Sequence, residues 1–82
     1  MENTIRPGTL NVDVSDRLSF VTFIIPYFAD EYKMNRQEAY HYLKKYGGID
    51  FIFKHWWTLH VDNPFWSVRG IHDFCHENGG LR

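Results

Sequence analysis

The sequence contains a single cysteine, Cys75, and this scarcity removes several classes of protein. One thiol cannot form an internal disulfide, so the sequence does not indicate a secreted domain stabilised by disulfide bonds. It also lacks the paired cysteines that make a zinc motif specific. We therefore expect a cytoplasmic protein that folds without disulfides or a structural metal.

Long apolar runs are missing as well. The longest, residues 20–25, is interrupted by Thr22 and is far shorter than the roughly 20 residues that span a bilayer. The first 16 residues are polar and contain no apolar stretch of the signal-peptide kind. The sequence predicts neither a membrane segment nor a secretion signal.

The chain has no marked surplus of positive or negative charge. It contains 9 Lys and Arg and 10 Asp and Glu, which gives a net charge of −1. Proteins dedicated to nucleic acids usually carry a basic surplus that neutralises phosphates. Here the longest basic run is Lys44-Lys45. A nucleic-acid-binding helical domain that uses Arg36, Lys44 and Lys45 is therefore an alternative and not the first expectation.

Aromatic residues, in contrast, are abundant: 3 Trp, 5 Tyr and 7 Phe in 82 residues. Each ring can bury roughly 150–250 Å². A chain of this length is one domain, and these rings give it enough apolar surface for a core of its own.

Helical spacing dominates the chain after residue 15. Ser15 or Asp16 offers an N-cap, and the apolar residues that follow recur three and four positions apart. Pro26 interrupts this first helix, and we expect a kink there, because the pattern continues in phase beyond it. The recurring residues are Leu18, Val21, Ile25, Phe28 and Tyr32.

Residues 1–15 show no such pattern. Residues 9–14 alternate between polar and apolar side chains, which is a weak strand signal. We expect an irregular N-terminal arm over residues 1–15, either a flexible tail or a short strand.

Three further helices are predicted from their start and stop signals. Asn35 with Glu38 three residues later forms a capping box, and Gly47-Gly48 ends that helix. A third helix covers residues 49–60. Asn63 followed by Pro64 begins the fourth, which we expect to bury Phe65, Val68 and Cys75 and to end at residues 78–80. The sequence thus predicts an all-α bundle of four helices over residues 16–82.

The last helix contains two histidines that could take part in metal binding. His72 and His76 lie four apart, so both rings could reach one ion, which makes a zinc-binding helical domain the second alternative. Cys75 beside them has no oxyanion-hole loop and reads as a small buried thiol. No glycine-rich phosphate loop is present. We expect no enzyme and no cofactor.

Adjacent tryptophans point to binding. If Trp56 faces the core, Trp57 lies about 100° away and is partly exposed. The same argument applies to Trp66, which is partly exposed if its neighbour Phe65 faces the core. Exposed Trp residues mark interaction surfaces, although rings can also lie flat over the seams between short helices. The sequence is compatible with either arrangement of the tryptophans.

Several short motifs resemble a family of small bacterial proteins of unknown function. The motifs are an aromatic-rich first helix over 18–25, an acidic second helix start at 34–39, a Lys-Tyr-Gly break into an Asp-aromatic-Ile helix at 45–52, the pair Leu59-His60, and a valine-containing last helix over 68–74.

Members of that family are often encoded beside putative toxins, some of which resemble ADP-ribosyltransferases. The resemblance implies an antitoxin-like or accessory protein whose partner is a toxin-like enzyme. We expect the binding surface to involve Trp57, Leu59, His60 and Trp66, and a homodimer is left open.

Overall fold

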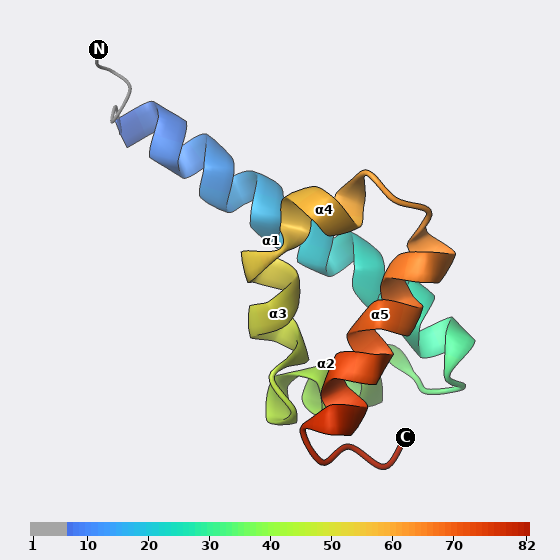
Figure 1. Cartoon of the computed structure of the whole chain (residues 1–82). Coiled ribbons are helices and arrows are strands. Elements are labelled where there is room, and N and C mark those ends of the chain that lie inside the picture. Colours follow the sequence, from blue (N-terminus) through green and yellow to red (C-terminus); the bar gives the residue numbers. More distant parts are fainter. Residues whose placement is uncertain (1–6) are drawn as a thin grey trace.

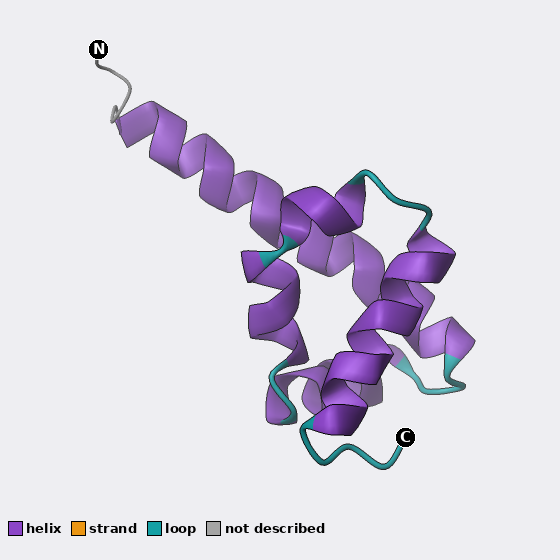
Figure 2. Cartoon of the chain, viewed as in Figure 1, coloured by secondary structure: helices purple, strands orange, loops and turns teal. Residues whose placement is uncertain are grey.

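The computed structural model describes residues 7–82, and their side chains from residue 14 onward. The described residues form five helices and no strand, as Figures 1 and 2 show. The helices are α1 (Pro7–Glu31), α2 (Arg36–Lys45), α3 (Gly48–Lys54), α4 (Trp56–His60) and α5 (Pro64–Glu77). The predicted all-α bundle is confirmed.

The long helix α1 organises the bundle, since it packs against each of the other four. Its C-terminal half crosses the body of the molecule, and its N-terminal half projects beyond the other helices (Figure 1). Pro26 lies inside α1, and the helix continues through it without a break. None of the described helices, α1 included, is both long enough and apolar enough to cross a membrane.

The irregular arm predicted for residues 1–15 is wrong from residue 7 onward, because α1 begins at Pro7 and residues 7–15 are helical. Proline is well suited to the first position of a helix, where its missing N–H would have no partner. The alternation over residues 9–14 was too short to outweigh that signal. Residues 1–6 lie outside the described part of the chain.

Helix ends follow local chemistry. Asn35 caps α2 in a complete capping box: its side chain accepts from the Glu38 N–H at 2.8 Å, and the Glu38 carboxylate accepts from the Asn35 N–H at 2.9 Å. Gly47 and Gly79 take the predicted left-handed conformation after α2 and α5, with φ of 80° and 102°. α1 ends in the same way on Lys33, with φ of 57°, where the Met34 N–H donates to the Ala29 carbonyl.

The predicted third helix is divided in two. His55 has φ −107° and ψ 22°, values that end α3 and begin α4. Arg17 of α1 holds this junction, because its guanidinium donates to the carbonyl of Phe53 at 2.5 Å and lies 5.8 Å from the centre of the Trp56 ring.

The core lies where α1, α2, α3 and α5 meet. Its largest fully buried side chains come from each of these helices, and Gly48 allows α3 to approach closely, since a Cβ there would lie 2.8 Å from the Cys75 sulfur. These largest fully buried side chains are Ile24, Phe28, Leu43, Ile52, Val68, Ile71 and Cys75.

Candidate protein-interaction surface

Trp57 lies on α4, a single short helix with no buried residue. Its side chain is 64% exposed, whereas that of Trp56 is half-buried beneath the neighbouring rings. The two indoles meet edge to face at 5.7 Å. The exposure that helical geometry predicts for Trp57 is confirmed.

His60 connects α4 to α1. Its ring stacks on Trp56 at 4.6 Å and lies 4.8 Å from the ring of Trp57. Its Nδ1 is 2.8 Å from the carbonyl oxygen of Trp57, which can only accept, so Nδ1 carries the proton in this arrangement. On the other side, Phe20 of α1 meets the imidazole edge-on at 6.3 Å.

Trp66 and Phe65 occupy the first turn of α5. The Asn63 side chain accepts from the Phe65 N–H at 2.8 Å, and Pro64 sets the first helical position. This start turns both rings outward: Trp66 is 59% exposed and Phe65 43%. The rings meet at 5.1 Å.

The expectation that Phe65 belongs to the core is therefore wrong. Ser67 is buried in its place, because its hydroxyl donates to the carbonyl of Leu59 at 2.7 Å. Leu59 itself is half-buried and packs against the core. Its role in the structure is to join α4 to α5, and it adds little to the exposed surface.

Two aromatic residues of α1 are exposed as well. Phe23 and Tyr27 are 47% and 46% exposed and pack together at 5.0 Å. Phe20 links them to His60, since it lies 6.0 Å from Phe23. Neither Phe23 nor Tyr27 belongs to the apolar spacing that predicts the buried face of this helix. Phe23 lies about 100° around the helix from Ile24, and Tyr27 lies about 100° from Phe28, so each ring is turned away from an adjacent buried residue.

We call these residues together the aromatic surface. Ring contacts run from α4 to α1, and a cleft lined by both Tyr27 and Phe65 continues the surface onto α5. Such a concentration of exposed aromatic area is typical of protein-binding sites. The aromatic surface comprises Phe23, Tyr27, Trp57, His60, Phe65 and Trp66.

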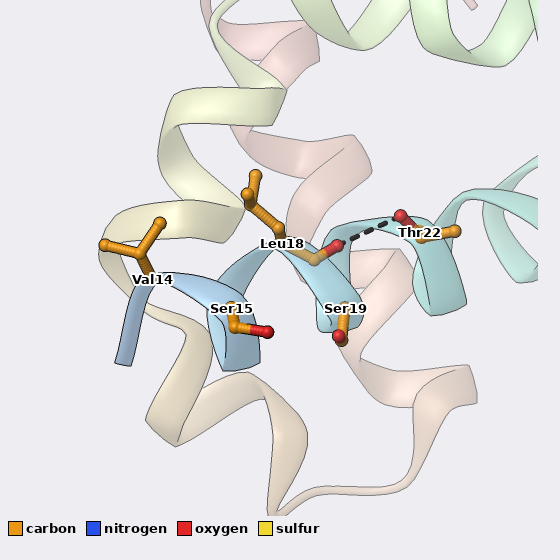
Figure 3. Close-up of a pocket in the computed structure, with 5 residues that line it drawn as sticks. All are labelled: Val14, Ser15, Leu18, Ser19 and Thr22. Carbon is orange, nitrogen blue, oxygen red and sulfur yellow. Dashed lines mark hydrogen bonds between the residues drawn. The ribbon is translucent and has the colours of Figure 1, made fainter. Parts of the chain in front are cut away.

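A second apolar face lies on the projecting half of α1. Val14, Leu18 and Thr22 line a shallow groove with two serines, and all five residues come from α1 (Figure 3). The Thr22 hydroxyl donates a hydrogen bond to the Leu18 carbonyl at 3.0 Å. Val14 and Leu18 are 44% and 53% exposed, so Leu18, which the spacing placed on the buried face, is not part of the core.

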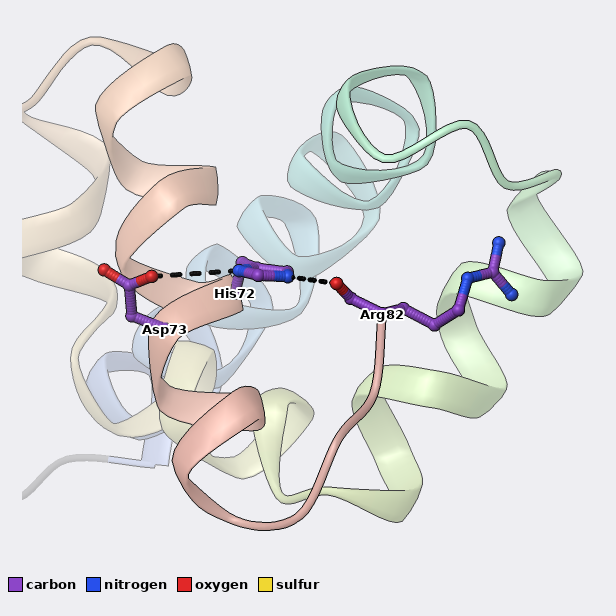
Figure 4. A network of polar contacts seen from close by, with 3 residues as sticks. All are labelled: His72, Asp73 and Arg82. Carbon is purple, nitrogen blue, oxygen red and sulfur yellow. Dashed lines mark hydrogen bonds and ion pairs between the residues drawn. The ribbon is translucent and has the colours of Figure 1, made fainter.

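His72 and His76 do lie near each other, with ring centres 6.1 Å apart. The Nε2 of His72, however, is 2.6 Å from the Arg82 carbonyl, and its Nδ1 is 3.7 Å from the Asp73 carboxylate (Figure 4). Its ring also stacks on Tyr32 at 4.2 Å. Among the described residues no group of three or more His, Cys, Asp or Glu side chains could hold a metal ion.

Cys75 is fully buried beside Gly48. Burial raises the pKa of its thiol to about 11, and a hydrogen bond with the Gly48 backbone opposes this only in part. A thiol with so high a pKa is protonated near neutrality and is a poor nucleophile.

Two of the three basic residues of α2 lie beside Tyr40. Lys44 lies 5.9 Å from the centre of the Tyr40 ring, and Arg36 lines a groove with Tyr40, Ile25 and Pro26. Lys45 lies 5.4 Å from the centre of the Tyr46 ring.

A comparison with protein families places most of the chain in one of them. Residues 19–78 match the model of a family described as a protein of unknown function, DUF3791. No curated protein and no solved structure matches the chain. The matched segment runs from the middle of α1 to the end of α5, which covers the core and the whole aromatic surface. The chain belongs to the DUF3791 family of proteins of unknown function.

Proposed function

We propose that the chain is a small protein-interaction module that binds a protein partner through the aromatic surface. The observation that carries this proposal is the exposure of two tryptophans, Trp57 at 64% and Trp66 at 59%, on neighbouring helices. Trp is enriched among residues that dominate binding energy, and burying an exposed indole in a partner removes a large apolar area from water.

The partner we propose is a toxin-like enzyme encoded by a neighbouring gene, with this chain acting in the cytoplasm as its antitoxin-like or accessory protein. Two observations support this. The chain resembles small bacterial proteins that are often encoded beside putative toxins. The second observation is that the thiol of Cys75, the single cysteine of the chain, is buried. It is therefore not exposed as a nucleophile, which fits a binding protein.

The test is a binding measurement with the product of the adjacent gene, by co-purification and then by titration calorimetry. We expect a complex with the wild-type chain. Replacing Trp57 and Trp66 together by Ala should weaken it at least about 30-fold, the effect of losing one hot-spot residue.

Tyr40→Ala is the matched control, because Tyr40 is another exposed aromatic residue, 39% exposed, on α2 and outside the aromatic surface. It should leave affinity unchanged. Circular dichroism should show that all variants are folded. No complex with the wild-type chain, or equal affinity of the double Trp variant and Tyr40→Ala, would refute the proposed function.

A further inference from the structure

A cleft lies within the aromatic surface, where the end of α1 packs against the start of α5. It has a volume of about 470 Å³. The rings of Tyr27 and Phe65 line it, and the buried Val68 contributes apolar surface. Asp30 and Glu31 of α1 also line it. The cleft thus combines apolar walls with two carboxylates.

The two carboxylates interact unfavourably with the dipole of their own helix. Asp30 and Glu31 lie in the last turn of α1, which contains no basic residue. The C-terminus of a helix carries partial negative charge, so acidic side chains there are unfavourable. Within the described part of the chain neither carboxylate forms an ion pair.

Arg69 of α5 flanks the cleft, because it contacts one of the rings that line it. Its guanidinium lies 5.5 Å from the centre of the Phe65 ring. It is close enough to Tyr32 to lower the pKa of that hydroxyl, although burial has the larger effect and raises it. Among the described residues Arg69 forms no ion pair with Asp30 or Glu31, so two carboxylates and one guanidinium at the edge leave the cleft with an excess of negative charge.

We propose that this cleft receives an arginine side chain of the protein partner. The aliphatic stem would pack between Tyr27 and Phe65, and the guanidinium would meet Asp30 and Glu31. Arginine suits the site better than lysine, because its planar group stacks on aromatic rings and forms paired hydrogen bonds to carboxylates. The inference rests on the proposed function, since it assigns the chemistry of that partner.

The first experiment needs no partner. The chain is titrated with N-acetyl-arginine amide and, separately, with the neutral isostere N-acetyl-citrulline amide, while backbone amide signals are followed by NMR. We expect saturable shifts confined to the residues around Tyr27, Asp30 and Phe65 with the arginine compound at millimolar concentration. The citrulline compound and the variant Asp30→Asn/Glu31→Gln should give none.

Equal shifts with both compounds, or no shifts with the arginine compound, would overturn the proposal. Amide signals at the cleft that instead change with protein concentration alone would assign it to a second copy of this chain and would also overturn it. None of these results bears on whether the tryptophans bind a partner, so the two proposals fail separately.

The second experiment uses the complex with the neighbouring gene product. Asp30→Asn/Glu31→Gln should weaken binding about tenfold and flatten its dependence on salt. The matched control is Asp73→Asn/Glu77→Gln, which removes the same two charges from the exposed end of α5 and should leave affinity unchanged. Equal affinity of the two double variants, with Trp57→Ala/Trp66→Ala still defective, would overturn the arginine proposal and leave the proposed function standing.

Discussion

Gly48 and Gly70 both lie inside helices, but only one of them has a packing reason to be glycine. A Cβ at Gly48 would lie 2.7 Å from Leu43 and 2.8 Å from the Cys75 sulfur, whereas a Cβ at Gly70 meets nothing within 4 Å. The same change to alanine should therefore have opposite effects on stability at the two positions.

We expect Gly48→Ala to destabilise the fold by about 1–3 kcal/mol through overpacking. Gly70→Ala should stabilise it by about 1 kcal/mol, because alanine is the better helix former. Urea unfolding followed by circular dichroism measures both, and each variant is the control of the other. A shift of the same sign in both would contradict the packing around Gly48.

Cys75 makes a pH-dependent contribution to stability. Burial raises the pKa of its thiol from 9.0 to about 11, so the folded state binds the proton more tightly than the unfolded state. The contribution is complete below pH 9 and is lost as the pH rises through 11. Stability should fall over this interval.

The variant Cys75→Ala isolates that contribution, because Tyr32 and Tyr42, whose pKa values burial also raises, titrate in both proteins. The difference in unfolding free energy between wild type and variant, measured by urea titration from pH 8 to 11.5, should shrink above pH 9. A difference that stays constant across the range would show that the thiol does not titrate as its burial requires.

At the scale of the helix, the capping box of α2 is the clearest local determinant. Asn35→Ala removes the acceptor for the Glu38 N–H and should cost about 1 kcal/mol. For a domain of this size that is roughly 4–8 °C in the thermal midpoint. Gln37→Ala, in the first turn of the same helix, is the control and should change the midpoint little. Equal midpoints for the two variants would contradict the cap.

Most helix boundaries could be predicted because they depend on a few adjacent residues. Asn35, Gly47 and the Asn63-Pro64 pair act within one turn, so the sequence displays them directly. The start of α1 at Pro7 was missed because residues 7–15 project from the body (Figure 1). A helix segment without a packed side shows no regular apolar spacing.

Side-chain placement in α5 depended on a contact that no local pattern contains. Ser67 is buried because its hydroxyl reaches the carbonyl of Leu59, eight positions earlier and on another helix. Val68 and Cys75 are buried as the spacing predicts, but Phe65 is 43% exposed. Sequence periodicity favours the large apolar residue at a core position, and it therefore placed Phe65 in the core.

For the whole molecule, the projecting half of α1 determines the shape. The principal extents are 46 × 22 × 21 Å and the radius of gyration of the Cα atoms is 13.8 Å, compared with about 12 Å for a compact domain of 82 residues. Small-angle scattering of a sample shown by light scattering to be monomeric should give the larger value. A radius near 12 Å would mean that α1 folds back onto the body.

The aromatic surface is likewise a property of the whole molecule. Trp57 and Trp66 could be predicted as exposed from the geometry of their own helices. Phe23 and Tyr27 join them only because α1 lies beside both α4 and the start of α5, an arrangement that no single helix specifies. The acidic cleft needs the same juxtaposition, and for that reason no pattern around Asp30 and Glu31 in the sequence predicts it.

The exposure of Trp57 and Trp66 has a spectroscopic consequence. Two of the three indoles in the chain already contact water in the folded state. The native fluorescence maximum should therefore lie close to that of the unfolded chain, and its wavelength will be a weak reporter of denaturation. A molecule that covers the surface should move the emission to the blue while the fold stays the same, so intrinsic fluorescence offers a label-free screen for whatever this protein binds.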